Sequence, residues 1–564
     1  MRSTYMALCV LVMALPAQAW VYVNAAAGAP GGSHNTANTA YTTLQAAVNA
    51  EASGTEIRII SDLSVSGTIL TLTSLTTASF TLTGWDDVAG AAINRTLTAT
   101  GTGRCITDAG TTTASLTASY LTWTTAVDGA YVISSSGDRS YTFDHCSFTK
   151  TDGNTGLCFY FPAVANATRT LTMTNCTVRG RDATLSNSLY LRGFAGVYLT
   201  DCTIQTGPTS GAGKVSDCLA IGLFDAVTVF KALRCTIESN RSGYPSINTT
   251  SITAGTLFSV RNCTINGSGC IKAPYYWDQV VIEGNTCTVL DANTGVQVGD
   301  EIVSAGGNNA HPLGRCIIRN NTISEPNGTA HALFLGDGSG PGECSGNTVI
   351  GGNYGIVCKA GNLAGIDTWD GATTGDGGYW IHHNKVLSHA TGGTVALFLA
   401  GSSRNVVEHN TVVALSGNAC SLNVTQSKAI STENIVRDNI FVSKGTGYAL
   451  SVATDAAGAK DNVIAGNLFW VTGSGKLASI AGTDCDTLQA IKDKWAATYA
   501  GTMYTSNGSG DLLADPLFIS STAGDAAFLR IPFKSPARGA ATNAYGDIGA
   551  DQRKERLGAS DLFP

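Results

Sequence analysis

Short runs in which apolar and polar residues alternate recur along most of the chain. They are clearest in HALFLGDG (331–338), YGIVCKAG (354–361) and VALFLAGS (395–402). Such alternation is typical of a strand with one buried face. Another short apolar segment, such as QVVIEGN (279–285), precedes each turn, and no helical pattern is long enough for a crossover helix. We therefore expect two or three short strands in each period.

A fixed motif separates these strands. Alignment of the motif places a cysteine in one column of the first six copies and an asparagine in the next six. The steps range from 24 residues (Cys263 to Cys287) to 37 residues (Asn347 to Asn384). A constant motif with variable spacing indicates a repeated structural element joined by variable loops. The column consists of Cys146, Cys176, Cys202, Cys235, Cys263, Cys287, Asn321, Asn347, Asn384, Asn410, Asn439 and Asn467.

The fold that satisfies this pattern most simply is an all-β, right-handed parallel β-helix, a solenoid whose coils stack about 4.8 Å apart. A helix over 41–52, with Thr42 or Thr43 as its N-cap, is expected to cap the N-terminal end. An amphipathic helix over 486–500 is expected at the other end. The expected organisation is a signal peptide (1–19), an N-terminal cap and first coil (20–68), the β-helix (69–475), and a C-terminal helix and capping segment (476–564).

Composition and charge restrict the partners. The chain has 65 glycines in 564 residues, only 13% charged residues and a net charge of −7, which gives no electrostatic support to a nucleic-acid partner. Arg2, the apolar run 6–15 and the Ala17-Gln18-Ala19 site are typical of a secretory signal peptide. No later segment is long and apolar enough to span a bilayer. We expect an exported protein, extracellular or periplasmic.

The asparagine column and the two ends of the chain resemble the pectate-lyase-like superfamily of secreted right-handed parallel β-helix proteins. Members often carry an internal stack of asparagines at a tight turn, which the six asparagines match. The opening segment (20–59) and the closing segment LLADPLFIS…GDIGADQR (512–553) are also similar to those of such proteins. The resemblance is specific for the fold and weak for the activity, because the superfamily includes lyases, hydrolases, esterases, phage tailspikes and adhesins.

The cysteines have three competing interpretations. Fifteen remain after Cys9 leaves with the signal peptide, so complete intramolecular pairing is excluded. The chain has no C-x-x-C pair, and a column spreads its thiols along an axis, which disfavours a zinc site. A disulfide or two between neighbouring coils stays open for an exported protein. The favoured interpretation is inward-facing filler.

Polar residues near the ends of successive strands are the candidates for chemistry. In polysaccharide lyases of the family that the chain resembles, the active cleft lies along one parallel sheet and its adjoining loops. Lys272 and Lys359 are candidate bases for a β-elimination, with Asp337 as a further catalytic candidate. Asp300, Glu301 and Asp337 are candidate Ca²⁺ ligands. A glycosidase would instead use two carboxylates, and ordinary solvated groups are the alternative to any site.

Aromatic residues cluster near these positions and in the long insertion 362–380. Exposed rings over a groove would stack on sugars, whereas rings on the flank of the helix would be structural. The candidates for substrate binding are Tyr275, Tyr276, Trp277, Trp369, Tyr379 and Trp380.

Two functions follow from these features. The first is a secreted carbohydrate-active protein that binds a polysaccharide or cell-surface glycan and cleaves it by a lyase-type reaction. The second is a non-catalytic extracellular structural or adhesive protein that assembles into a surface layer, filament or fibre. Low charge and regular coils favour the second, and the set of lysines, acids and aromatics favours the first.

Overall fold

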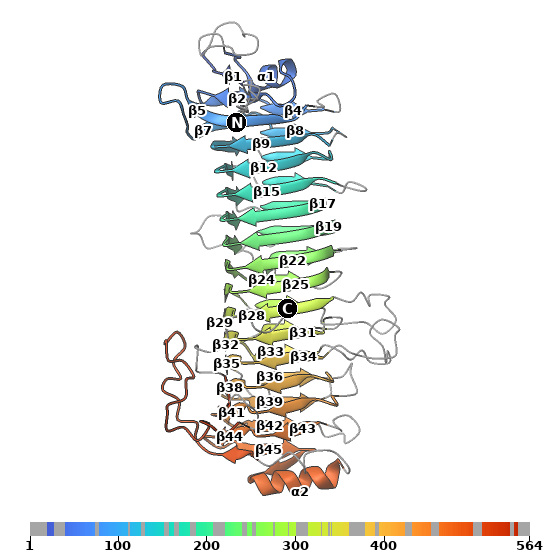
Figure 1. The fold of residues 1–564 in the computed structure, drawn as a ribbon, viewed down its shortest axis with the longest axis vertical. Helices are drawn as coiled ribbons and strands as arrows, with labels where there is room; N and C mark the ends of the chain where they lie inside the picture. The colour runs from blue at the N-terminus through green and yellow to red at the C-terminus, as the bar shows by residue number, and fades with distance from the viewer. Residues whose placement is uncertain are drawn as a thin grey trace, which may run out of the picture.

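The structure is a tall column of stacked strands, with one helix at each end (Figure 1). The computed structural model describes residues 20–26, 40–73, 78–110, 113–125, 130–151, 157–162, 168–180, 188–206, 220–239, 245–250, 255–273, 277–291, 293–299, 314–326, 328, 330–336, 339, 341–359, 378–389, 394–423, 431–452, 462–499, 510–541 and 546–550. The predicted signal peptide lies outside these residues. The expected fold class, an all-β right-handed parallel β-helix with an N-terminal helix and a C-terminal closing segment, is confirmed.

Each coil contributes strands to three parallel surfaces, which we call faces A, B and C. Face C is the outer surface of a 16-stranded sheet. Its strands are β3 (Leu63–Ser66), β7 (Arg95–Thr100), β10 (Leu121–Thr125), β13 (Ser147–Lys150), β16 (Thr177–Gly180), β18 (Thr203–Thr206), β20 (Thr236–Ser239), β23 (Thr264–Gly267), β26 (Thr286–Val289), β29 (Thr322–Glu325), β32 (Thr348–Gly351), β35 (Lys385–Ser388), β38 (Thr411–Ala414), β41 (Ile440–Ser443), β44 (Leu468–Val471) and β47 (Leu512–Leu513).

Faces A and B belong to a 31-stranded sheet, in which β17 (Leu189–Thr200) and β19 (Ile221–Leu233) run through both faces. The other strands of face A are β4 (Leu70–Leu72), β8 (Ile106–Asp108), β11 (Ile133–Ser135), β14 (Phe159–Phe161), β21 (Pro245–Thr250), β24 (Gly269–Ala273), β27 (Val296–Val298), β30 (His331–Leu335), β33 (Tyr354–Cys358), β36 (Val395–Ala400), β39 (Asn418–Asn423), β42 (Tyr448–Val452) and β45 (Lys476–Ile480).

The strands of face B precede the repeated turn. They are β1 (Trp20–Val23), β2 (Glu56–Ile59), β5 (Phe80–Asp86), β9 (Ser115–Ser119), β12 (Ser140–Asp144), β15 (Thr170–Thr174), β22 (Gly255–Arg261), β25 (Trp277–Glu283), β28 (Arg315–Arg319), β31 (Gly342–Ser345), β34 (Tyr379–His382), β37 (Val406–Glu408), β40 (Ile435–Arg437) and β43 (Val463–Ala465). All of these pairings are parallel, whereas the short strands β6 (Ala91–Ala92) and β46 (Thr483–Cys485) pair antiparallel with β5 and β45.

From β9 onward, a residue in the left-handed conformation follows each strand of face B and turns the next residue inward. His145, Asn175, Asn262 and His383 have φ values of 51 to 55° at this position, and Gly284 has 68°. From Asn285 to Asn467, each inward asparagine donates its Nδ2–H to Oδ1 of the next over 2.9–3.0 Å. The same oxygen accepts the backbone N–H over 2.9–3.1 Å. The buried amides therefore satisfy one another from coil to coil.

The predicted column is confirmed except at Cys287. Asn285 takes the ladder position, because its Oδ1 accepts the N–H of Cys263 and Gly284 supplies the left-handed turn. Cys287 instead lies on β26 and pairs with Ile265. The column thus has five cysteines followed by seven asparagines, and Asp511 ends the ladder by accepting the N–H of Asn467 at 2.7 Å.

A second asparagine ladder runs at the turn between faces A and B. Asn405 donates Nδ2–H to Asn434 at 2.8 Å, and Asn434 donates to Asn462 at 2.9 Å. Each of the three stands five residues before a member of the first ladder. All the described cysteines are free and buried, and no disulfide joins described residues. The prediction that the cysteines fill the interior of the helix is therefore confirmed for these residues.

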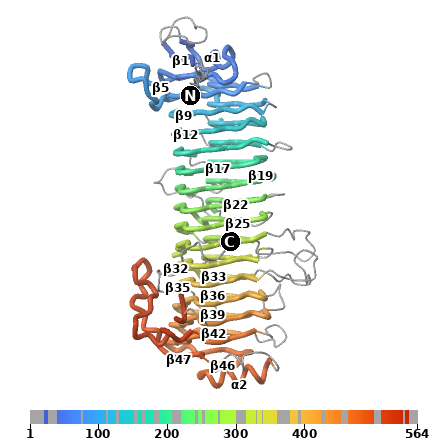
Figure 2. Tube along the Cα trace, in the orientation of Figure 1, coloured from blue at the N-terminus to red at the C-terminus, as the bar shows by residue number. Residues whose placement is uncertain are grey.

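The two ends are covered as the sequence predicts. Helix α1 (Leu44–Ala50) has Thr43 as its N-cap, and α2 (Leu488–Thr498) buries Ile491 and Trp495. Neither helix has the length and apolar character needed to cross a bilayer. After α2, residues 510–541 and 546–550, which we call the C-terminal strap, return along the column (Figure 2, orange to red). The strap packs Phe528, Leu529 and Ile548 on apolar side chains of face C.

Candidate functional site

Lys272 lies near the middle of face A and points outward. Ile271 and Ala273, its neighbours on β24, are buried, while Lys272 is half-buried. Its register partners on the adjacent coils are Asn248 on β21 and Gln297 on β27. Three polar side chains therefore lie side by side along the axis, at the strand spacing of about 4.8 Å.

Two polar groups at and beside Lys272 have no hydrogen-bond partner among the described residues. The Lys272 ammonium has neither a hydrogen-bond nor an ion-pair partner among them. Oδ1 of Asn248 also has none, although this oxygen is buried. Gln297 is engaged, because its Nε2 donates to the carbonyl of Gly299 at 3.0 Å. Since buried polar atoms are rarely left unpaired, the surroundings of Lys272 are suited to a polar ligand.

Aromatic rings stack along face A on the N-terminal side of Lys272. Tyr131, Tyr160, Tyr190 and Phe224 follow one another at centroid distances of 4.8, 5.4 and 4.6 Å. The guanidinium of Arg104 lies 4.8 Å from the centre of the Tyr131 ring. Because each ring covers the face of the next, the stack presents ring edges and hydroxyl groups outward rather than open faces.

Arg192 adds a cation beside this stack. Its Nε donates to Asp225 at 2.6 Å and one terminal nitrogen lies 3.3 Å from the Tyr190 hydroxyl. Burial works to lower the pKa of Arg192, but the hydrogen bond to Asp225 and the nearby Tyr190 outweigh it and raise the pKa above its ordinary value. About a third of the Arg192 side chain is exposed, so a charged ligand can still reach it.

Apolar rings and a further cation follow on the C-terminal side. Phe334 and Val357 are outward residues of β30 and β33 and are almost fully covered. The Lys359 ammonium lies 5.4 Å from the centre of the Phe334 ring, within cation–π range. Tyr354 stacks on Phe398 at 5.9 Å on the next coil.

We call this set the cation–aromatic file of face A. It extends over eleven successive coils of one surface and carries four cations in a protein whose net charge is −7. An elongated ligand with repeated negative groups would meet a cation at every third coil. The file consists of Arg104, Tyr131, Tyr160, Tyr190, Arg192, Phe224, Lys272, Phe334, Tyr354, Lys359 and Phe398.

The two predicted lysines lie on the same face but not side by side. Three strand spacings, from β24 to β33, separate them, which is roughly 14 Å. They can therefore contact one extended chain, but not the same bond. Tyr275, Tyr276, Asp300, Glu301, Asp337 and Trp369 lie outside the described residues. No cluster of metal ligands occurs within the described ranges, so the Ca²⁺ site at Asp300, Glu301 and Asp337 stays a prediction.

Two of the predicted aromatic residues point into the helix, so they cannot stack on a sugar outside it. Trp277 and Tyr379 are 0% and 1% exposed. Each ring fills space above a glycine of the preceding coil, since a Cβ on Gly255 or Gly342 would lie 2.3 Å from the ring. Alternation along β34 then turns Trp380 outward, on face B. Its indole Nε1 donates to Glu408 at 2.8 Å.

Most of the file could not be predicted from the repeated motif. The strands that carry Arg192, Asn248 and the tyrosines lie a variable number of residues away from the cysteine column, so the motif does not fix their register. A signal is present: Tyr160 and Tyr190 are the middle residues of Phe-Tyr-Phe and Leu-Tyr-Leu, where alternation with two buried neighbours turns the middle ring outward.

Comparison with known proteins adds little. No family model matches the chain, and no curated protein sequence matches it. Among solved structures, the periplasmic alginate epimerase AlgG is 12% identical over 68% of this chain and 74% of its own, with a TM-score of 0.27. The pectate lyase Pel9A is 12% identical over 94% of this chain and 96% of its own, with a TM-score of 0.16. At such TM-scores neither structure bears on what this chain does.

Proposed function

We propose that this is an exported protein that binds an acidic polysaccharide along face A. The observation that carries the proposal is the cation–aromatic file, which sets four cations at regular intervals beside a row of aromatic rings on face A. Carboxylate groups of a uronate chain would pair with Arg192, Lys272 and Lys359. Hydroxyl groups of the sugars would meet the tyrosine edges.

The chemistry proposed for this site is lyase-type β-elimination centred on Lys272. The neutral amine of Lys272 would take the proton α to the uronate carboxylate, a C=C bond would form as the glycosidic C–O bond at the β carbon breaks, and the leaving oxygen would take a proton from water. A positive charge at the carboxylate would stabilise the developing negative charge. Lys272 has no partner among the described residues to compete for its amine. In this proposal Asp300, Glu301 and Asp337 hold Ca²⁺ against the same carboxylate, which is a role that oxygen ligands suit.

A non-catalytic adhesive role is the second candidate. It is favoured by one observation: within the described residues no carboxylate faces Lys272 that could serve as an acid partner in catalysis. Binding without cleavage would then be the whole function of the file.

The mature protein tests both candidates when it is incubated with polygalacturonate and alginate, with and without Ca²⁺. We expect binding in affinity electrophoresis and the ultraviolet absorbance of unsaturated products. Lys272→Ala is expected to abolish the absorbance and weaken binding by about tenfold to a hundredfold, as for one lost charge-assisted contact. Lys231→Ala is the matched control, because Lys231 is an exposed lysine on face B. Binding without absorbance would favour the adhesive role, and no binding to any uronate would refute both.

A further inference from the structure

A chain of three imidazoles links the outer side of face B to the C-terminal strap. His382 and His383 join through their Nδ1 atoms at 2.8 Å, and the ring of His383 stacks on that of His409 at 5.2 Å. His409 is 1% exposed, and its Nδ1 lies 3.1 Å from the backbone carbonyl of Asp547 in the strap. Because a carbonyl only accepts, Nδ1 of His409 carries a proton in this contact.

Hydrogen bonds to face C and its turns also attach the strap at this place. The N–H of Gly549 donates to the carbonyl of Asp438 at 2.8 Å, and the N–H of Ala550 donates to Oγ1 of Thr411 at 3.0 Å. Lys385 donates to the carbonyl of Phe528 at 3.0 Å. Underneath, the strap covers apolar residues of face C, which consist of Leu387, Val413, Ile440, Val442 and Leu468.

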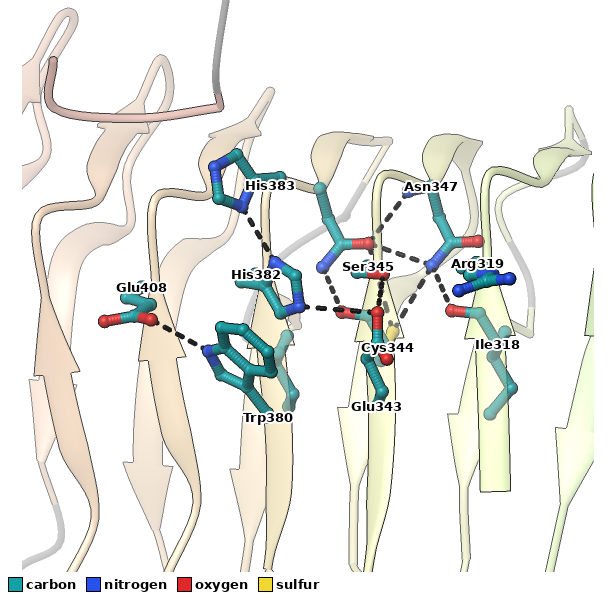
Figure 3. A network of polar contacts seen from close by, with 12 residues as sticks. Ile318, Arg319, Glu343, Cys344, Ser345, Asn347, Trp380, His382, His383 and Glu408 are labelled. Carbon is teal, nitrogen blue, oxygen red and sulfur yellow. Dashed lines mark hydrogen bonds and ion pairs between the residues drawn. The ribbon is translucent and has the colours of Figure 1, made fainter. Parts of the chain in front are cut away.

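Charged groups surround the imidazoles on every element packed against them, and most already face an opposite charge. Glu408 accepts from Arg437 at 2.7 Å, and Asp547 accepts from Arg538 at 2.5 Å. Glu343 lies 3.6 Å from Nε2 of His382 and accepts the Ser345 hydroxyl at 2.6 Å (Figure 3). Among the described residues, these groups are Glu343, Glu408, Asp438 and Asp547 with Arg319, Arg437, Arg538 and Lys385.

A second proton disrupts this arrangement. The hydrogen bond between His382 and His383 needs a proton on only one of the two Nδ1 atoms. If both Nδ1 atoms carried a proton, two donors would face each other at 2.8 Å. The added charge would also lie against the ring of His409. Burial, together with the charges of His382 and His409, accordingly lowers the pKa of His383 from 6.5 to about 3.

We propose that His383, between His382 and His409, forms an acid-sensitive latch: at neutral pH the neutral imidazole chain holds the C-terminal strap on face C, and a proton taken up by His383 places a charge against the ring of His409 and loosens the strap. Because the His383 pKa is lowered in the latched state, latching is most stable above pH 6.5 and weakens as the pH falls toward 3. Uptake of one proton makes the open fraction rise about tenfold per pH unit in this window.

Hydrogen exchange of the full mature protein between pH 7 and pH 4 tests the latch, with rates corrected for the intrinsic effect of pH. We expect protection of residues 528–531 and 546–550 to fall by about tenfold per pH unit below 6.5. His383→Asn removes the titrating ring but keeps the turn, since asparagine occupies the same left-handed position at Asn175, Asn262 and Asn320. This variant should keep its protection at pH 4.

Two further variants complete the design. His409→Asn removes the bond to Asp547, and we expect the strap to be open at pH 7 as well. His145→Asn is the matched control, because His145 holds the same turn position with φ 51° in a coil remote from the strap, and it should behave as the wild type. Unchanged strap protection from pH 7 to pH 4 in the wild type would overturn the proposal, as would a pH response in His383→Asn equal to that of the wild type.

Discussion

Single residues on the outer side of face B neutralise one another from coil to coil. Arg319 donates to Glu283 at 2.7 Å, and Arg437 donates to Glu408 at 2.7 Å. Glu343 differs because its partner is an imidazole rather than a guanidinium. The His382 imidazole, 3.6 Å away, is the main cause that lowers the pKa of Glu343 from 4.5 to about 2, against the effect of burial.

This shift predicts how stability depends on acid. A carboxyl group with a lowered pKa stabilises the fold above its unfolded value, and this contribution is lost as the pH falls from 4.5 toward 2. It amounts to roughly 3 kcal/mol at most. Glu343→Gln should therefore lose less unfolding free energy than the wild type over this range, measured by urea denaturation at a series of pH values. Glu283→Gln is the control, and parallel curves for wild type and Glu343→Gln would contradict the prediction.

At the level of elements, two kinds of internal column hold the coils in register. Asn384 donates Nδ2–H to Asn410 and to the carbonyl of Cys344, and its Oδ1 accepts the N–H of Asn347. Removal of the amide would leave buried polar groups without partners. By contrast, the Cys202 thiol donates only weakly, at 3.3–3.4 Å, to two carbonyls.

The two columns should therefore differ in their sensitivity to truncation. Asn384→Ala is expected to lower the unfolding free energy by roughly 3–5 kcal/mol, because orphaned buried groups cost about 1–3 kcal/mol each. Cys202→Ala removes little more than one buried group and should cost about 1 kcal/mol. Urea unfolding followed by circular dichroism measures both. Equal losses in the two variants would mean that the asparagines fill space as the cysteines do.

Much of the fold follows from the sequence because a turn motif and an alternating strand pattern repeat in register. Cys287 was wrongly placed in the column because it lies only two residues after the true ladder residue. The Gly-Asn pair at 284–285 matches the later copies of the motif and takes the ladder position in the structure. Lys272 could be placed on an outer face from its buried neighbours. The inward turn of Trp277 could not, since it depends on Gly255 of another coil.

The whole molecule is a long column, and the four cations of the file are spaced along face A. From Arg192 on β17 to Lys359 beyond β33, the file crosses six strand spacings, or roughly 29 Å. A short ligand can meet one cation, whereas a long one can meet three at once. Affinity should therefore increase with the length of the ligand. Salt should weaken binding, because the cations are partly exposed to solvent.

The most direct test of this account is the affinity for oligouronates of increasing length, measured by titration calorimetry. For the wild type and for Lys231→Gln, we predict that affinity rises with length until the ligand spans the distance from Arg192 to Lys359. The triple variant Arg192→Gln, Lys272→Gln, Lys359→Gln should lose this rise. Affinity that is independent of length, or a triple variant that binds long oligomers as the wild type does, would contradict the assignment of face A as the polysaccharide-binding surface.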